Sequence, residues 1–137
     1  MVFDDQISSN LIKRQESDPA LKNLFCVGRH YAISQIWMLQ RFRGTIDPTC
    51  RDQFTMISIF KQGNKKGLLD LLQDYDESPE EDHKVGLRNL FQSYLESVEE
   101  NDGHGAFTIH VLKSHGSGRL ERGLGSGKYF DSESKKE

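Results

Sequence analysis

The sequence lacks a long hydrophobic run and a large excess of charge of either sign. No apolar stretch reaches about 18 residues, so no membrane-spanning helix is expected, and no charged-then-apolar leader marks a signal peptide. The formal net charge of −3 excludes a chain that binds nucleic acid through its overall charge. Any contact with DNA must therefore be local, and the cytosol is the expected compartment.

Cysteine and proline are also scarce. The two cysteines, Cys26 and Cys50, lack the spacing of a metal site and suit a reducing compartment; whether they form a disulfide is left open. With only three prolines and 35% hydrophobic residues, the chain has the composition of a folded protein rather than a disordered one. We expect residues 1–130 to form one domain and residues 131–137 to be a charged, disordered tail.

Hydrophobic periodicity predicts strands and helices that alternate along the chain. Such alternation indicates an α/β fold with a mostly parallel sheet and flanking helices, in which ligands bind at the carboxyl ends of the strands. The glycine-rich stretch Gly116–Gly127 is expected to be a flexible loop with solvated basic residues. The expected strands are Val2–Phe3, Ile33–Leu39, Phe54–Phe60 and Ala106–Leu112, and the expected helices are Pro19–Val27, Lys65–Tyr75 and Glu80–Glu99.

Two adjacent carboxylates, Asp4 and Asp5, follow the apolar residues of the first expected strand. A strand that delivers an acid to the carboxyl edge of a parallel sheet is the physical form of a Walker B motif, in which one acid holds Mg²⁺ and the next orients water. Taken alone the pattern is weak, because two acids after three apolar residues often occur by chance. A solvated strand end is the alternative.

A longer pattern favours the Walker B interpretation. The stretches MVFDD, LFCVGRHYAISQIWMLQRF and PTCRDQFTMISIFKQGNKKGLLDLLQDY resemble, in order and spacing, the second half of the poxvirus-type genome-packaging ATPases of large DNA viruses. Those proteins are similar to the FtsK and HerA DNA translocases. The resemblance implies a partial P-loop NTPase fold whose Walker A half is absent, since no GxxxxGK[ST] occurs in the sequence. That absence would leave the strand at 33–39, expected to be covered on both faces, with an unpaired edge.

The resemblance implies a role for each of five residues. Asp4 resembles the acid that binds Mg²⁺ through water, and Asp5 the acid that polarises the attacking water. Gln40 resembles the sensor of the γ-phosphate, where an amide can donate to a phosphate oxygen and accept from water. Arg29 resembles the arginine that a neighbouring subunit supplies in catalysis. Arg51 is expected near the nucleotide or at a subunit contact, with a structural salt bridge as the alternative for either arginine.

The resemblance also implies a function and partners. With ATP and Mg²⁺, a homo-oligomeric ring of the complete protein would drive double-stranded DNA into a capsid, in contact with capsid or portal components. The missing Walker A half would be a further partner, so this chain alone is expected to be inactive. Its expected location is the host cytoplasm at the viral assembly site, or the virion. The alternatives are a non-hydrolysing remnant or split subunit that regulates a partner ATPase, and a nucleic-acid-binding domain that uses basic residues between Arg41 and Lys66.

Overall fold

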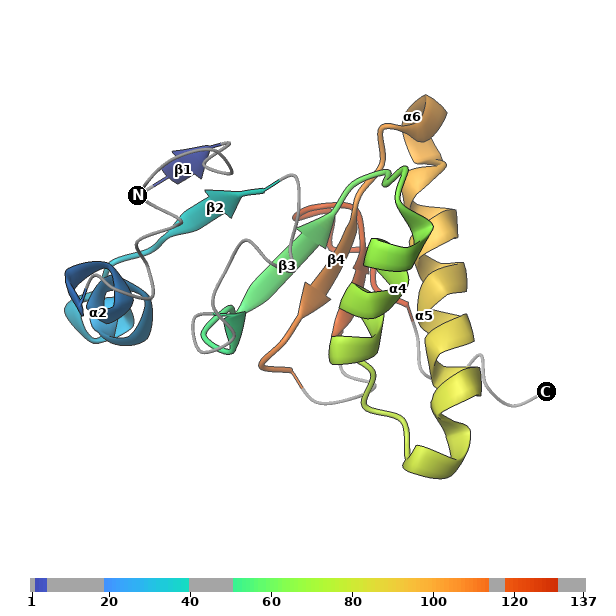
Figure 1. Cartoon of the computed structure of the whole chain (residues 1–137). Coiled ribbons are helices and arrows are strands. Elements are labelled where there is room, and N and C mark those ends of the chain that lie inside the picture. The colour runs from blue at the N-terminus through green and yellow to red at the C-terminus, as the bar shows by residue number, and fades with distance from the viewer. Residues whose placement is uncertain (1, 5–18, 40–50, 114–117, 131–137) are drawn as a thin grey trace. The chain divides into compact units, whose positions relative to one another are not determined.

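The structure is a computed structural model that describes residues 2–4, 19–39, 51–113 and 118–130 (Figure 1). The chain divides into two compact units, Met1–Phe54 and Thr55–Glu137, and each unit is described by itself. Across the described ranges, no helix has both the length and the apolar character needed to cross a membrane.

The first unit contains two paired strands with a helical connection between them. Strand β1 (Val2–Asp4) pairs in parallel with β2 (Ile36–Met38). The connection includes α2 (Pro19–Val27) and the 3-10 helix η1 (Gly28–Tyr31). Helix α2 has the predicted bounds, because proline is tolerated at a first helical position, where its missing N–H is not needed.

The expectation that β2 is covered on both faces is wrong. Ile36 and Met38 are 58% and 44% exposed, and only Trp37 between them lies on the half-buried side. In an extended strand, successive side chains point to opposite faces, so a single face of β2 is packed. Partly buried Cys26, Trp37, Leu39 and Phe54 contribute to the packing of this unit.

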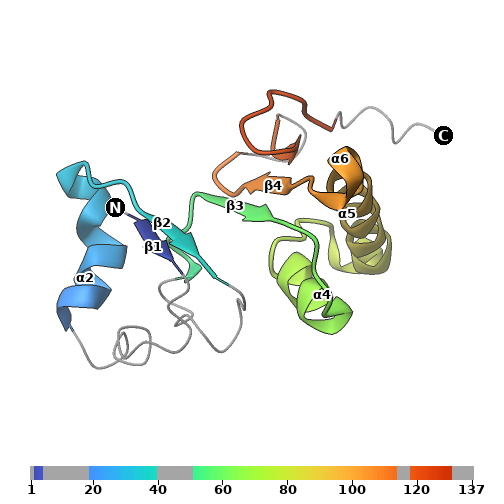
Figure 2. The same ribbon diagram turned by 90° about the horizontal axis from the view of Figure 1, so that it is seen from above.

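The second unit is a three-stranded antiparallel sheet with helices beside it, in the strand order β3-β4-β5. Figures 1 and 2 both show α4 and α5 lying together next to this sheet. The elements of the unit are, in chain order, β3 (Met56–Ile59), α4 (Lys65–Asp74), the 3-10 helix η2 (Glu80–Asp82), α5 (His83–Val98), α6 (Glu100–Gly103), β4 (Phe107–His110) and β5 (Leu120–Arg122).

The expectation of a mostly parallel P-loop sheet is therefore wrong. The reason lies in the number of helices between β3 and β4. A single crossover helix returns the chain to the end of the sheet where the first strand began, so that the next strand is parallel. Here α4 and α5 run in opposite directions and return the chain to the end where β3 stops (Figure 1). Strand β4 consequently runs antiparallel to β3.

The face of the sheet that packs against the helices carries the apolar core. Phe107 and Ile109 of β4 are fully buried, and Ile59 of β3 is 4% exposed. The Phe107 ring meets the Tyr94 ring of α5 edge to face, with 6.4 Å between the ring centroids. Burying each such side chain contributes about 1.5–3 kcal/mol. The other buried apolar residues of this core are Leu68, Leu71, Leu72, Leu90, Val98 and Ala106.

Gly105 allows β4 to start directly against α5. A Cβ atom at this position would lie 1.9 Å from the carbonyl oxygen of Ser97. Such a distance is far inside van der Waals contact, so no other residue fits without displacing the backbone. Gly105 thus fixes the spacing between the helix and the strand that follows it.

Candidate functional site

The predicted acidic strand end lies at one edge of the first unit. Because β1 and β2 are parallel, their carboxyl ends lie at the same edge, and Asp4, the last residue of β1, is in register with Met38, the last residue of β2. The structure describes the backbone of Asp4 and not its side chain. Asp5 and Gln40 follow these strands in the sequence and lie outside the described residues.

The two predicted arginines also belong to the first unit. Arg29 lies in η1, directly after α2, and its side chain is outside the described part of the structure. Arg51 is half-buried, and its carbonyl oxygen accepts a hydrogen bond from the Phe54 amide at 3.2 Å.

The residue types at this edge suit a magnesium ion. Mg²⁺ prefers hard oxygen ligands and is usually bound by one or two carboxylates with several retained waters. Asp4, Asp5 and the amide of Gln40 offer such oxygens, so the donor set fits the ion by its chemistry. Within the described ranges, no group of three or more His, Cys, Asp or Glu could hold a metal.

Gln35 is a residue of this unit that the sequence analysis missed. Its Nε2 donates to the carbonyl oxygen of Leu24 in α2 at 2.6 Å, and its Oε1 accepts from the indole Nε1 of Trp37 at 3.2 Å. A polar residue in a segment predicted to be buried needs hydrogen-bond partners. The position of a glutamine within ISQIWML was therefore the signal that could have identified it.

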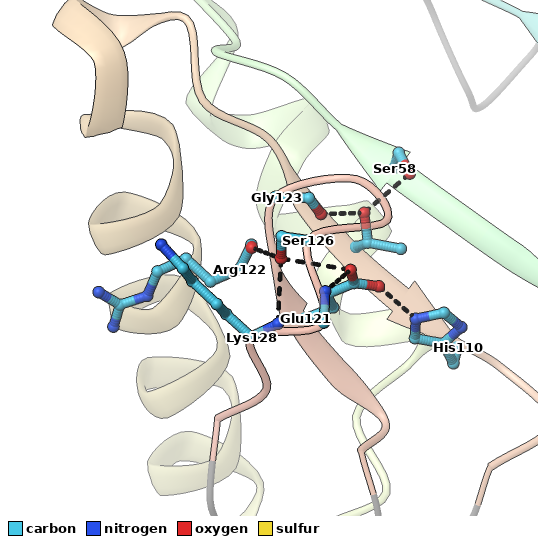
Figure 3. Close-up of polar contacts among 9 residues, drawn as sticks. Ser58, His110, Glu121, Arg122, Gly123, Ser126 and Lys128 are labelled. Atoms are coloured by element: carbon cyan, nitrogen blue, oxygen red, sulfur yellow. Dashed lines mark hydrogen bonds and ion pairs between the residues drawn. The ribbon is translucent and has the colours of Figure 1, made fainter.

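The second unit holds a separate polar cluster on the face of the sheet opposite the apolar core (Figure 3). Glu121 of β5 is only 2% exposed, and its carboxylate accepts from His110 Nε2 at 2.7 Å, from the Gly127 amide at 3.1 Å and from Ser126 Oγ at 3.3 Å. Ser126 Oγ also contacts the carbonyl oxygen of Arg122 and accepts from the Lys128 amide at 3.1 Å. The Glu121 cluster, as we name these contacts, closes the loop against the sheet.

Hydroxyl groups continue the Glu121 cluster across the strands. Thr108 is fully buried and donates its hydroxyl proton to the carbonyl oxygen of Gly123 at 2.7 Å. A hydroxyl has only one proton, so Ser58 Oγ must donate to Thr108 Oγ1 across their 2.8 Å separation. The carboxylate and the hydroxyl groups of the Glu121 cluster thus all have partners inside the protein, which fixes the loop in one arrangement.

The Glu121 carboxylate is suited to structure rather than to proton transfer. Burial by itself would raise the pKa of Glu121, but the hydrogen bonds from His110, Gly127 and Ser126 together lower it below its ordinary value. A carboxylate that is saturated with donors and stays ionised is a poor general acid. The ionised carboxylate instead holds the glycine-rich loop by accepting hydrogen bonds from Gly127 and Ser126.

The expectation of a flexible 116–127 loop is wrong where the structure describes this stretch. It contains β5, and the Gly123 amide donates to the carbonyl oxygen of Ala106 at 2.7 Å. The Gly127 amide, which a phosphate could otherwise have attracted, already binds the Glu121 carboxylate. Residues 114–117 lie outside the described residues.

The basic residues of this stretch are engaged within the second unit. Arg119 is only 5% exposed; it donates to the Tyr75 carbonyl oxygen at 3.1 and 3.0 Å and pairs with Glu77 at 3.3 Å. Arg122 pairs with Glu96 at 3.2 Å and with Glu100 at 3.3 Å. The expectation of solvated charges is therefore wrong for Arg119, which ties β5 to the connection between α4 and α5.

No protein-family model, no curated protein and no solved structure matches the chain. The Glu121 cluster is buried and its polar groups have partners within the cluster, whereas Asp4 ends β1, and Asp5 and Gln40 follow β1 and β2 in the sequence. We therefore place the candidate functional site at the carboxyl edge of β1 and β2.

Proposed function

We propose that the first unit supplies the acidic strand end and an arginine-bearing turn to a DNA translocase of the genome-packaging kind, driven by hydrolysis of MgATP. The observation that supports this proposal most is the parallel pairing of β1 with β2, which puts Asp4 in register with the end of β2, two residues before Gln40. The proposal concerns the role of this unit and does not include a P-loop fold for the chain.

Each polar residue of the edge has a distinct task in this proposal. Asp4 holds Mg²⁺ through water, and Asp5 orients the attacking water. When bound there, Mg²⁺ would neutralise charge that develops on the transferred phosphoryl group. Gln40 contacts the γ-phosphate and that water through one amide, Arg29 acts on the nucleotide of a neighbouring subunit, and Arg51 lies near the nucleotide or the subunit contact.

The proposed partners follow from what the sequence does not contain. The 137 residues include no GxxxxGK[ST], so the β- and γ-phosphates must be bound by a further segment that carries this motif. A heterologous ring of identical subunits brings Arg29 of one subunit to the acids of the next. Double-stranded DNA and capsid or portal components are the other proposed partners.

The test is ATP hydrolysis by the purified chain, alone and together with a GxxxxGK[ST]-bearing polypeptide encoded by the same genome. The chain alone is expected to show no turnover above background. The complex is expected to bind MgATP and hydrolyse it, and Asp4→Ala is expected to abolish hydrolysis, while Asn23→Ala on the exposed side of α2 leaves it unchanged.

Two results would contradict the proposal. Turnover by the chain alone that Asp4→Ala removes would show that the phosphates are bound within these 137 residues. A complex that assembles but never hydrolyses ATP would instead favour a non-hydrolysing chain that regulates its partner.

A further inference from the structure

We infer that Gln35 is a positioning residue that holds the Arg29-bearing turn in place against β2. This inference rests on the proposed function, because it assigns Gln35 an effect that acts through Arg29. Three features of the described residues carry it: the two hydrogen bonds of Gln35, the close contact of Gln35 with Gly28, and the backbone conformation of Ala32.

The Gln35 side chain joins the end of α2 to β2. Its donated bond to the Leu24 carbonyl oxygen, at 2.6 Å, satisfies a carbonyl group in the last turn of the helix, where intrahelical donors run out. Its accepted bond from Trp37 Nε1, at 3.2 Å, connects the same amide to the middle of β2. One side chain thus couples the residues before the Arg29 turn to the strand that leads to Gln40.

The turn itself is shaped around this side chain. A Cβ atom at Gly28 would lie 2.8 Å from Gln35 Nε2, so the amide sits directly over the glycine that precedes Arg29. The Ile33 amide donates to the Gly28 carbonyl oxygen at 3.1 Å and closes the turn. A Cβ atom at position 28 would therefore displace the Gln35 amide from this position.

Ala32 shows that the turn needs such a restraint. Its φ of 56° lies in the left-handed region, which an alanine rarely adopts. Conformations of this kind persist only when the surrounding contacts fix them. Residues on both sides of Ala32 form such contacts: Gly28 and Ile33 are joined by a backbone hydrogen bond, and Gln35 is bonded to Leu24. These bonds hold Ala32 in its left-handed conformation.

The structural part of the inference is tested by NMR on the full 137-residue chain. The chain has a single tryptophan, so the Trp37 indole N–H gives one assignable signal. Gln35→Met removes both bonds; it is expected to shift the indole signal and to speed exchange of the Ile33 amide by on the order of tenfold. Gln35→Glu keeps the acceptor for Trp37 and loses the donor to Leu24, so the indole signal should stay while Ile33 exchange rises.

Two further variants make this test decisive. Gly28→Ala perturbs the contact from the opposite side and is expected to reproduce both changes of Gln35→Met, so the inference can be tested even if Gln35→Met does not fold. Asn23→Ala, on the exposed side of α2, is the matched control and should change neither signal. Ile33 exchange that stays within about twofold of the original chain in the Gln35 variants would overturn the inference.

The catalytic part is tested in the reconstituted ATPase. Gln35→Met is expected to lower kcat by roughly 10- to 100-fold with little change in the KM for ATP, and the double variant with Arg29→Ala should be no slower than Arg29→Ala alone. Additive losses would show that Gln35 does not act through Arg29, which overturns the inference and leaves the proposed function intact. An assembled complex with no hydrolysis at all would overturn the proposed function, and the NMR result would then decide the structural part alone.

Discussion

At the scale of single residues, Glu121 shows how this chain treats a buried charge. The carboxylate is almost fully inaccessible, yet it accepts from a ring nitrogen, a hydroxyl and a backbone amide. A buried carboxylate without such partners would take up a proton or destabilise the fold. Its surroundings thus turn a costly group into an anchor for the glycine-rich loop.

This arrangement predicts an acid-sensitive stability. The hydrogen bonds lower the folded pKa of Glu121 below its ordinary value of 4.5. The ionised carboxylate therefore contributes fully to the free energy of unfolding above pH 4.5, and this contribution is lost as the pH falls through the folded pKa. We expect Glu121→Gln to reduce the free energy of unfolding at pH 7 by about 1–3 kcal/mol. The stability of the Glu121→Gln variant should also fall less than that of the original chain when the pH is lowered from 5 toward 3.

Urea unfolding at several pH values measures this effect. The control is Glu99→Gln, because Glu99 forms an ion pair with Lys61 at 3.6 Å in which both side chains are more than 60% exposed. Exposed pairs contribute little, so the control should change stability by less than about 1 kcal/mol and keep the original pH dependence. Equal pH dependence in Glu121→Gln and the original chain would show that Glu121 is not the acid-sensitive group.

A second prediction at this scale concerns Gly105. The Cβ atom of an alanine would overlap the Ser97 carbonyl oxygen, so Gly105→Ala is expected to lower the free energy of unfolding by about 2–3 kcal/mol. Gly63 has no heavy atom within 4 Å of its Cβ position, and Gly63→Ala should stay within about 0.5 kcal/mol of the original chain. Similar thermal midpoints for the two variants would contradict the close contact.

At the scale of elements, the sequence predicted the helices better than the sheet. Pro19 and Gly28 bracket α2, and local signals of this kind identify helix ends without knowledge of the rest of the fold. Strand direction depends instead on where the chain returns. The break between α4 and α5 was visible in the sequence as Asp76–Pro79, but the local pattern did not show that the two helices bring β4 back antiparallel to β3.

The prediction for the glycine-rich stretch at 116–127 was wrong for a different physical reason. Glycines normally indicate a loop because they weaken strands. In this chain only Leu120, Glu121 and Arg122 form β5, and the glycines that follow allow the backbone to fold back over Glu121. A strand of three residues surrounded by glycine carries too little periodicity to be recognised, so both β5 and the buried Glu121 were missed.

Strand β2 carries a prediction about association. Within the described residues it pairs only with β1, its Ile36 and Met38 side chains are exposed, and no charge or proline lies between Ile33 and Leu39. Edges of this kind pair with other chains. We therefore expect the isolated chain to form oligomers at concentrations of about 1–100 µM, measured by light scattering after size-exclusion chromatography.

Lysine substitutions locate the association surface. Ile36→Lys is expected to reduce oligomer formation, because an edge charge opposes strand pairing. Val85→Lys is the matched control, since Val85 is 55% exposed on α5 and lies in the other unit. Gln35, although it neighbours Ile36, is unsuitable because its side chain is hydrogen-bonded. An original chain that stays monomeric over the whole concentration range would show that the β2 edge does not mediate association.

At the scale of the whole molecule, the sequence predicted the two strands on which the candidate site is placed. The acidic end of β1 and its neighbour β2 could be identified because apolar runs that end in polar residues mark strand ends. Gln35 could not be given a role, because its partners Leu24 and Trp37 belong to a helix and a strand whose packing the sequence does not specify. The overall fold was predicted wrongly because two helices lie between β3 and β4 and return the chain antiparallel, and the local pattern does not show where the chain returns.

The central claim concerns neighbouring subunits: the acids at the end of β1 and the Arg29 turn serve one nucleotide from two adjacent chains. The most direct measurement is the ATP hydrolysis rate of mixed complexes made from Arg29→Ala and Asp5→Asn chains, each reconstituted with the GxxxxGK[ST]-bearing polypeptide. In a random equal mixture, roughly a quarter of the interfaces combine an intact Asp5 with an intact Arg29 from the next chain. We predict hydrolysis well above that of either variant alone. Mixtures that never exceed the separate variants would contradict the claim.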